Sequence, residues 1–80
     1  MKYDDYYLCD NIKNLRIINN YSLTYTAKQL HISVKTLKSI EKGYVPKKAN
    51  PKLSHFASLL FNIPEKTLYV PSQFSTFLFL

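Results

Sequence analysis

The sequence predicts one all-α domain, a compact five-helix bundle followed by an apolar tail, and three observations lead to this prediction. The chain has 80 residues, which suffice for one domain with one small core. Hydrophobic residues make up 46% of the chain and charged residues 20%, a globular composition. A single glycine argues against a many-turned β fold, and apolar residues recur at helical spacing in successive segments.

The first helix is predicted from four apolar residues at helical spacing, with Asp5 or Asp10 as its N-cap. Asn19 and Asn20 break the pattern and end this helix. Residues 1–10 are therefore expected to form an N-terminal arm, residues 11–70 the domain and residues 71–80 a tail. The apolar positions of the first helix are Leu8, Ile12, Leu15 and Ile18.

The second helix begins after Ser22, a good N-cap, and has a short inner face. His31 and Ile32 are all that separate this helix from Ser33, a second good N-cap. We expect His31 to be a turn residue, since a histidine at such a position is far more often part of the turn than a metal ligand. The inward residues of the second helix are Thr26, Ala27 and Leu30.

The third helix is predicted over Val34–Lys42, with Leu37 and Ile40 facing inward. Gly43 follows directly and ends it, because glycine is the usual residue just past a helix C-terminus. Residues 43–49 then form a basic loop.

The fourth helix is predicted to begin with Asn50 as its cap and Pro51 at its first position. Asn62 ends it, and Pro64 starts a short fifth helix that carries Leu68 and Tyr69 and stops at Pro71. The inward residues of the fourth helix are Leu53, Phe56, Ala57, Leu60 and Phe61.

The positive charge is concentrated in the middle of the chain. The formal net charge is +6, but ten of the eleven basic residues lie between residues 11 and 66 against only Glu41 and Glu65. That stretch is therefore +8, while the first ten residues are acidic and the last fourteen uncharged. A basic centre is the electrostatic pattern expected for a polyanionic partner.

The second and third helices have the arrangement of a helix-turn-helix, in which the second helix of the pair enters the DNA major groove. Small Ala27 stands where the two helices approach closely. The spacing resembles that of the lambda-repressor-like (Cro/C1-type, XRE) DNA-binding family over residues 11–70. The residues that carry the resemblance are Ile12 to Arg16, Ser22, Ala27, Leu30, Ile32, Ser33, Leu37, Ile40, Glu41, Gly43, Leu68 and Tyr69.

The resemblance implies a five-helix bundle that binds paired half-sites as a homodimer, with 34–42 as recognition helix. It also implies a structural salt bridge between Arg16 and Glu41. The chain departs from the family pattern at Leu23, where glutamine is frequent and contacts the DNA backbone, and at Thr26, where an apolar residue is usual.

Helical geometry independently places three lysines on the outer face of residues 34–42. At about 100° per residue, Lys35, Lys38 and Lys42 fall within about 60° of one another, opposite Leu37 and Ile40. Lysine binds guanine or phosphate, so we expect a large phosphate component and few direct base contacts. The predicted DNA-binding residues are Ser33, Val34, Lys35, Lys38, Ser39, Lys42, Lys47 and Lys48.

The uncharged tail must bury its apolar side chains against something. It could form a dimer contact, as a strand or by aromatic packing, or it could fold back onto the helices of its own chain. The sequence leaves both open. The candidate contact residues are Phe74, Phe77, Leu78 and Phe79.

The sequence predicts a sequence-specific double-stranded DNA-binding regulator, a repressor type, that needs no cofactor or metal. The alternative is an antitoxin-type interaction module that binds another protein through the tail. An enzyme is not expected, because the chain has no Gly-rich phosphate loop and no recognisable catalytic pair. The lone Cys9, the absence of a signal-peptide pattern and the absence of a long apolar stretch predict a cytoplasmic protein without membrane association.

Overall fold

The computed structural model describes the backbone of residues 3–47, 49 and 51–71, and their side chains from Tyr6 onward. Four α-helices and a 3-10 helix make up this part of the chain, and it contains no β-strand. The predicted all-α class is confirmed. The elements are α1 (Tyr3–Ile18), α2 (Leu23–Gln29), α3 (Val34–Glu41), α4 (Leu53–Phe61) and the 3-10 helix η1 (Glu65–Tyr69).

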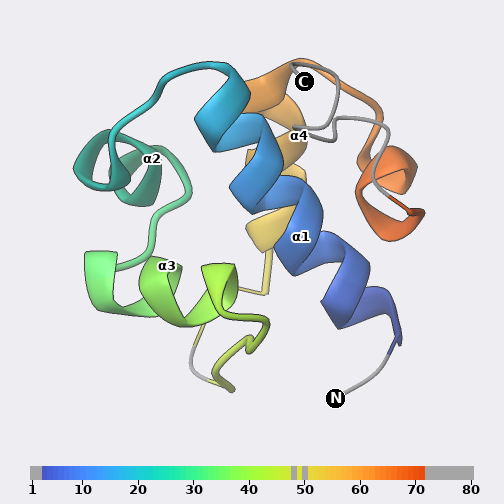
Figure 1. Ribbon diagram of the computed structural model, residues 1–80, viewed down its shortest axis with the longest axis horizontal. Helices are drawn as coiled ribbons and strands as arrows, with labels where there is room; N and C mark the ends of the chain where they lie inside the picture. Colours follow the sequence, from blue (N-terminus) through green and yellow to red (C-terminus); the bar gives the residue numbers. More distant parts are fainter. Residues whose placement is uncertain (1–2, 48, 50, 72–80) are drawn as a thin grey trace, which may run out of the picture.

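Helix α1 runs through the middle of the molecule (Figure 1). Helices α2 and α3 lie on one side of it, and η1 lies on the other. Helix α4 packs behind α1 and also contacts α2 and η1. All other elements are thus arranged around α1. No helix within the described ranges is long and apolar enough to cross a membrane.

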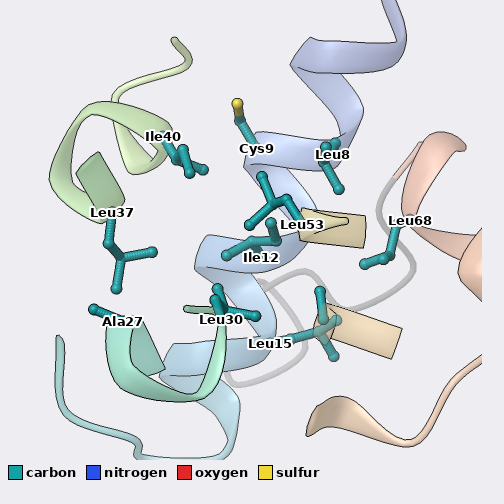
Figure 2. Close-up of a cluster of buried hydrophobic side chains, with 11 residues drawn as sticks. Leu8, Cys9, Ile12, Leu15, Ala27, Leu30, Leu37, Ile40, Leu53 and Leu68 are labelled. Atoms are coloured by element: carbon teal, nitrogen blue, oxygen red, sulfur yellow. The ribbon is translucent and has the colours of Figure 1, made fainter. Parts of the chain in front are cut away.

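One hydrophobic core joins these elements, and Figure 2 shows its side chains converging from all of them. In the α2–α3 contact, Leu37 is directed toward Ala27, whose small side chain lets the two helices approach. Burying each large apolar side chain contributes roughly 1.5–3 kcal/mol. The core residues are Leu8, Cys9, Ile12, Leu15, Ala27, Leu30, Leu37, Ile40, Leu53, Ala57 and Leu68.

The ends of α2 and α3 are where the sequence predicts them. The hydroxyls of Ser22 and Ser33 accept hydrogen bonds from the N–H groups of Tyr25 and Thr36, which confirms both N-caps. Each of the four α-helices is followed by a residue with positive φ, namely Asn20, His31, Gly43 and Asn62. The chain's sole glycine occupies only one of these positions, so asparagine and histidine supply the left-handed conformation at the others.

The first helix begins earlier than predicted. Residues 3–10, expected to form an arm in front of the domain, belong to α1, so neither Asp5 nor Asp10 caps it. Leu8 and Cys9 are both buried in the core. The helix therefore extends toward the N-terminus because these side chains already face its neighbours.

The fourth helix begins later than predicted. Pro51 lies in a turn before α4, whose N-cap is Lys52 without a side-chain capping bond. Asn50, the expected cap, lies outside the described residues. Leu53 is the first buried residue of this segment, and the helix begins there, so burial and not a local cap sets its start.

The predicted fifth helix is a single 3-10 turn after Pro64, stabilised by the bond from the N–H of Thr67 to the Pro64 carbonyl (3.0 Å). Leu68 is fully buried and Tyr69 half-buried. The predicted contacts of the tail at Phe74, Phe77, Leu78 and Phe79 lie outside the described residues.

Candidate nucleic-acid interface

Helix α3 has one buried face and one charged face. Leu37 and Ile40 are 0% exposed, and they fix α3 to the core. Lys35 and Lys38 are exposed on the opposite side, and Lys42 is exposed at the C-cap. The three lysines, called the lysine face below, are therefore presented to solvent together, as helical spacing predicts.

The only acidic residue of α3 is neutralised from another helix. Arg16 of α1 donates from Nε to Glu41 Oε2 (2.5 Å) and from Nη2 to Oε1 (3.0 Å), a two-pronged ion pair. A third bond runs from Arg16 Nη1 to the carbonyl of Tyr21 (2.9 Å). The ion pair predicted from the sequence is thus present. It ties α3 to α1 and keeps the charge of Glu41 from cancelling that of the lysine face.

The turn between α2 and α3 sets the orientation of α3. His31 has φ of 59°, and its N–H and that of Ile32 donate to the carbonyls of Lys28 and Ala27 (3.2 and 3.0 Å). The His31 ring packs against Phe56 of α4, with ring centroids 4.2 Å apart. His31 is therefore a turn and packing residue, and no cluster of three metal-ligating side chains occurs in the described ranges.

The Ser33 side chain forms its hydrogen bonds within the helix that it caps. Its hydroxyl accepts from the N–H of Thr36 and donates to Thr36 Oγ1, both at 3.0 Å. The hydroxyl proton is therefore engaged within α3. A phosphate contact by the Ser33 side chain remains a prediction, and it would require this bond to Thr36 to be exchanged.

The other predicted contact residues differ in exposure. Val34 is half-buried and packs against the core, while Ser39 is half-buried on α3. Lys47 is exposed in the loop after α3. Lys48 lies outside the described residues.

The loop after α3 starts from a defined helix end. The N–H groups of Gly43 and Tyr44 donate to the carbonyls of Ile40 (2.8 Å) and Ser39 (3.0 Å), a Schellman motif. Gly43 has φ of 101°, and no heavy atom lies within 4 Å of where a Cβ would stand. Backbone conformation and not lack of space therefore favours glycine here.

Two exposed residues next to the lysine face, Lys13 and Tyr44, are not found by sequence reasoning. Lys13 of α1 lines the same small cavity, about 110 Å³, as Lys42 and the acidic residues Asp10 and Glu41. Tyr44, 58% exposed, follows directly after Gly43. The position of Lys13 beside Lys42 depends on how α1 packs on α3, so no local pattern could have revealed it.

Asn11 is a third position that sequence reasoning misses, and its role is structural. It is fully buried, and its Nδ2 lies within hydrogen-bonding distance of the carbonyls of Leu68 (2.8 Å), Val70 (3.0 Å) and Thr67 (3.4 Å). A signal existed: Asn11 lies three residues after Leu8 and four before Leu15, on the apolar side of α1. A polar residue at such a position needs a buried partner.

Comparisons of the chain with protein-family models, with curated proteins and with solved structures give no match.

Proposed function

We propose that the chain is a sequence-specific double-stranded DNA-binding regulator, a repressor that acts as a homodimer. In this proposal, α2, the turn at residues 30–33 and α3 form a helix-turn-helix, and α3 with Lys42 enters the major groove. The observation that carries the proposal is the lysine face on a helix whose opposite face is fully buried. Because the core holds α3 rigidly, its outer face can be presented to DNA without reorganisation.

The electrostatics support a polyanion as partner. Lys13 and Lys47 add exposed positive charge on α1 and on the loop that flank α3, and the ion pair with Arg16 neutralises Glu41. The major groove of B-DNA is about 12 Å wide and admits one α-helix. An eight-residue helix held at both ends by Ser33 and Gly43 fits this role.

The lysines set the kind of binding. Lysine can bond guanine O6 or N7, but it lacks the planar fork of arginine and often acts as a point charge on phosphate. We expect affinity to fall steeply with salt, with a logarithmic slope of roughly −0.9 per phosphate neutralised.

The test is a selection of bound sites from random DNA duplexes, with the native chain, Lys35→Ala, Lys38→Ala and the control Lys66→Ala. Lys66 is an exposed lysine on η1, which packs on α1 and α4. We expect a paired motif from the native chain and the control. Removing a lysine that bonds a base costs about 1–3 kcal/mol and relaxes the motif at one position, whereas removing a phosphate contact lowers affinity evenly and reduces the salt slope by about 1.

The outcomes distinguish a DNA-binding regulator from an antitoxin-type interaction module. Failure to enrich any motif contradicts sequence-specific binding. If the chain then retains a second polypeptide only when residues 72–80 are present, an antitoxin-type interaction module explains it better.

A further inference from the structure

An open groove of about 330 Å³, lined by apolar residues and by the polar side chains of Lys47 and Ser54, lies between α1, α4, η1 and the loop after α3. Leu8 and Leu53 contribute from the two helices, and Tyr69 contributes from η1. Val45 and Pro46 form the wall on the side of the loop. Leu8 lies on the side of the core away from α2 and α3, so the groove is separate from the contact between these helices (Figure 2).

The chain leaves the described structure at the edge of this groove. Tyr69 lines it, and Pro71 is the last described residue. Asn11 fixes the exit, because its Nδ2 donates to the carbonyls of Leu68 (2.8 Å) and Val70 (3.0 Å). Leu8, a groove residue, lies one helical turn before Asn11 on the same side of α1. The start of the tail is thus anchored to the helix that forms one groove wall.

The segment that follows is uncharged and long enough to reach the groove. Residues 72–80 have no charged side chain and include Phe74, Phe77 and Phe79. An extended chain spans at most about 3.3–3.6 Å per residue, so Phe74 can lie up to about 10 Å from Pro71, and the later phenylalanines can lie farther.

The geometry points to the chain's own residues 72–80 as the occupant of this groove, docked in cis with phenylalanine side chains between Tyr69 and the loop at Val45 and Pro46. Tethering decides between this occupant and a second copy. The tail is attached at Pro71, two residues after Tyr69 in the groove wall, so its effective concentration at the groove is on the order of millimolar. A second copy at micromolar concentration is outcompeted by a large factor, because both tails carry the same side chains.

A second cavity of about 290 Å³, between α2 and α4, provides the contrast. Gln29, His31, Phe56, Leu59 and Leu60 line it, and Leu59 is 64% exposed. No residue of η1 lines this cavity, whereas Tyr69 of η1, two residues before Pro71, lines the groove.

Docking of the tail also bears on the candidate interface. Lys47 lines the groove together with Val45 and Pro46, so a docked tail holds the loop that carries this lysine beside α3. Only this consequence rests on the proposed function. The docking itself is tested without DNA, so a failure of the tail to dock and a failure to bind DNA are separate results.

The experiment is solution NMR of the full chain with labelled leucine and valine methyl groups. We expect nuclear Overhauser contacts from the methyl groups of Leu8, Val45 and Leu53 to the phenylalanine rings of the tail. We also expect none of these contacts in an isotope-filtered spectrum of a mixture of labelled and unlabelled chains. Contacts in the filtered spectrum would show that the tail of a second copy occupies the groove. Contacts at Leu59 or Leu60 would show that the tail occupies the other cavity. Either result, or the absence of any contact between the tail and the groove, overturns the inference.

A variant of unchanged length tests the same point by amide exchange. In the triple variant Phe74→Ser, Phe77→Ser, Phe79→Ser, we expect the amides of Tyr44, Val45 and Lys47 to exchange at least tenfold faster; Pro46 has no amide proton. Amides of α2, such as that of Leu30, serve as the internal control and should keep their rates. Unchanged exchange throughout residues 44–47 would contradict the docking.

Discussion

The α2–α3 pair and the α4–η1 segment are built from similar short helices, yet different interactions fix their ends. In the α2–α3 pair, each boundary coincides with a residue that acts locally: Ser22 and Ser33 cap through their side chains, and His31 and Gly43 adopt the left-handed backbone conformation. In the α4–η1 segment, α4 begins without a side-chain cap. The start of η1 is held by bonds within the segment, from the Thr67 N–H to Pro64 and from Ser54 to Glu65, but its end is held by Asn11, more than fifty residues earlier in the chain.

This difference predicts how each region responds to mutation. A local cap contributes about 1 kcal/mol, and the helix remains packed when the cap is lost. A buried side chain that satisfies several distant carbonyls has no substitute, because its removal leaves those groups without water or partner. The substitutions that destabilise the α4–η1 segment most should therefore lie on α1 and not within the segment itself.

Asn11→Ala should have the largest effect. It removes the donor to the carbonyls of Leu68 and Val70 and opens a cavity beside the core, so we expect the free energy of unfolding to fall by about 3 kcal/mol. Urea denaturation followed by circular dichroism measures this. Asn14→Ala is the matched control on the same helix; Asn14 is half-buried, with its Nδ2 3.4 Å from Asp10, and we expect a change below about 0.5 kcal/mol. Equal effects of the two variants would remove the distinction between the regions.

Arg16→Ala should have the next largest effect, because the ion pair links the α2–α3 pair to α1. The side chains of Arg16 and Glu41 are 18% and 11% exposed, so the remaining Glu41 is largely desolvated. We expect a loss of about 2 kcal/mol, or a fall in Tm of about 10 °C for a domain of this size.

The control for Arg16 is a double-mutant cycle with Glu41→Ala. A coupling energy of at least about 1 kcal/mol is expected if the two side chains act on each other, and purely additive losses would contradict the pairing. Lys13→Ala, an exposed basic residue on the same helix, should leave the Tm within about 2 °C.

The contrast between the regions also explains how much of the fold the sequence could predict. The bounds of α2 and α3 follow from Ser22, Ser33 and Gly43, because capping acts on neighbouring residues and is visible as a local pattern. The starts of α1 and α4 were predicted wrongly, since packing of Leu8, Cys9 and Leu53 in the core sets them. A capping residue or proline nearby carries no information about that packing.

The same division applies to the candidate interface. Lysines that share a face of α3 are predictable, because helical periodicity alone places them. The position of Lys13 is not predictable, because it arises where α1 meets α3. The helical spacing signals that Asn11 is buried, but its partners on η1 follow only from the packing of η1 on α1. The resemblance to a helix-turn-helix family indicated the Arg16–Glu41 pair, which spans 25 residues and has no local signature.

Ser33→Ala tests the local side of the comparison. Ser33→Ala removes the N-cap bond from the N–H of Thr36 and the bond to Thr36 Oγ1, and we expect a cost of about 1 kcal/mol; Ser33→Thr should restore most of it because threonine also caps. Ser58→Ala is the control: the Ser58 hydroxyl donates to the His55 carbonyl at an exposed site, and we expect a change below about 0.5 kcal/mol. A loss as large as that of Asn11→Ala would show that α3 depends on its cap more than on the core.

Thr26→Val should have the smallest effect and the opposite sign. Thr26 of α2 is fully buried, and its Oγ1 has no hydrogen-bond partner in the part of the chain that the structure describes. Exchanging this hydroxyl for a methyl group keeps the shape and removes the cost of burying an unpaired polar atom, so we expect a gain of up to about 1 kcal/mol in urea denaturation. Thr36→Val is the matched control on α3, because Thr36 Oγ1 accepts a bond from Ser33 (3.0 Å) and its loss should destabilise. If both threonine variants lose stability alike, the hydroxyl of Thr26 is satisfied in solution, and the α2–α3 pair contains a polar contact as constraining as the one that Asn11 makes with η1.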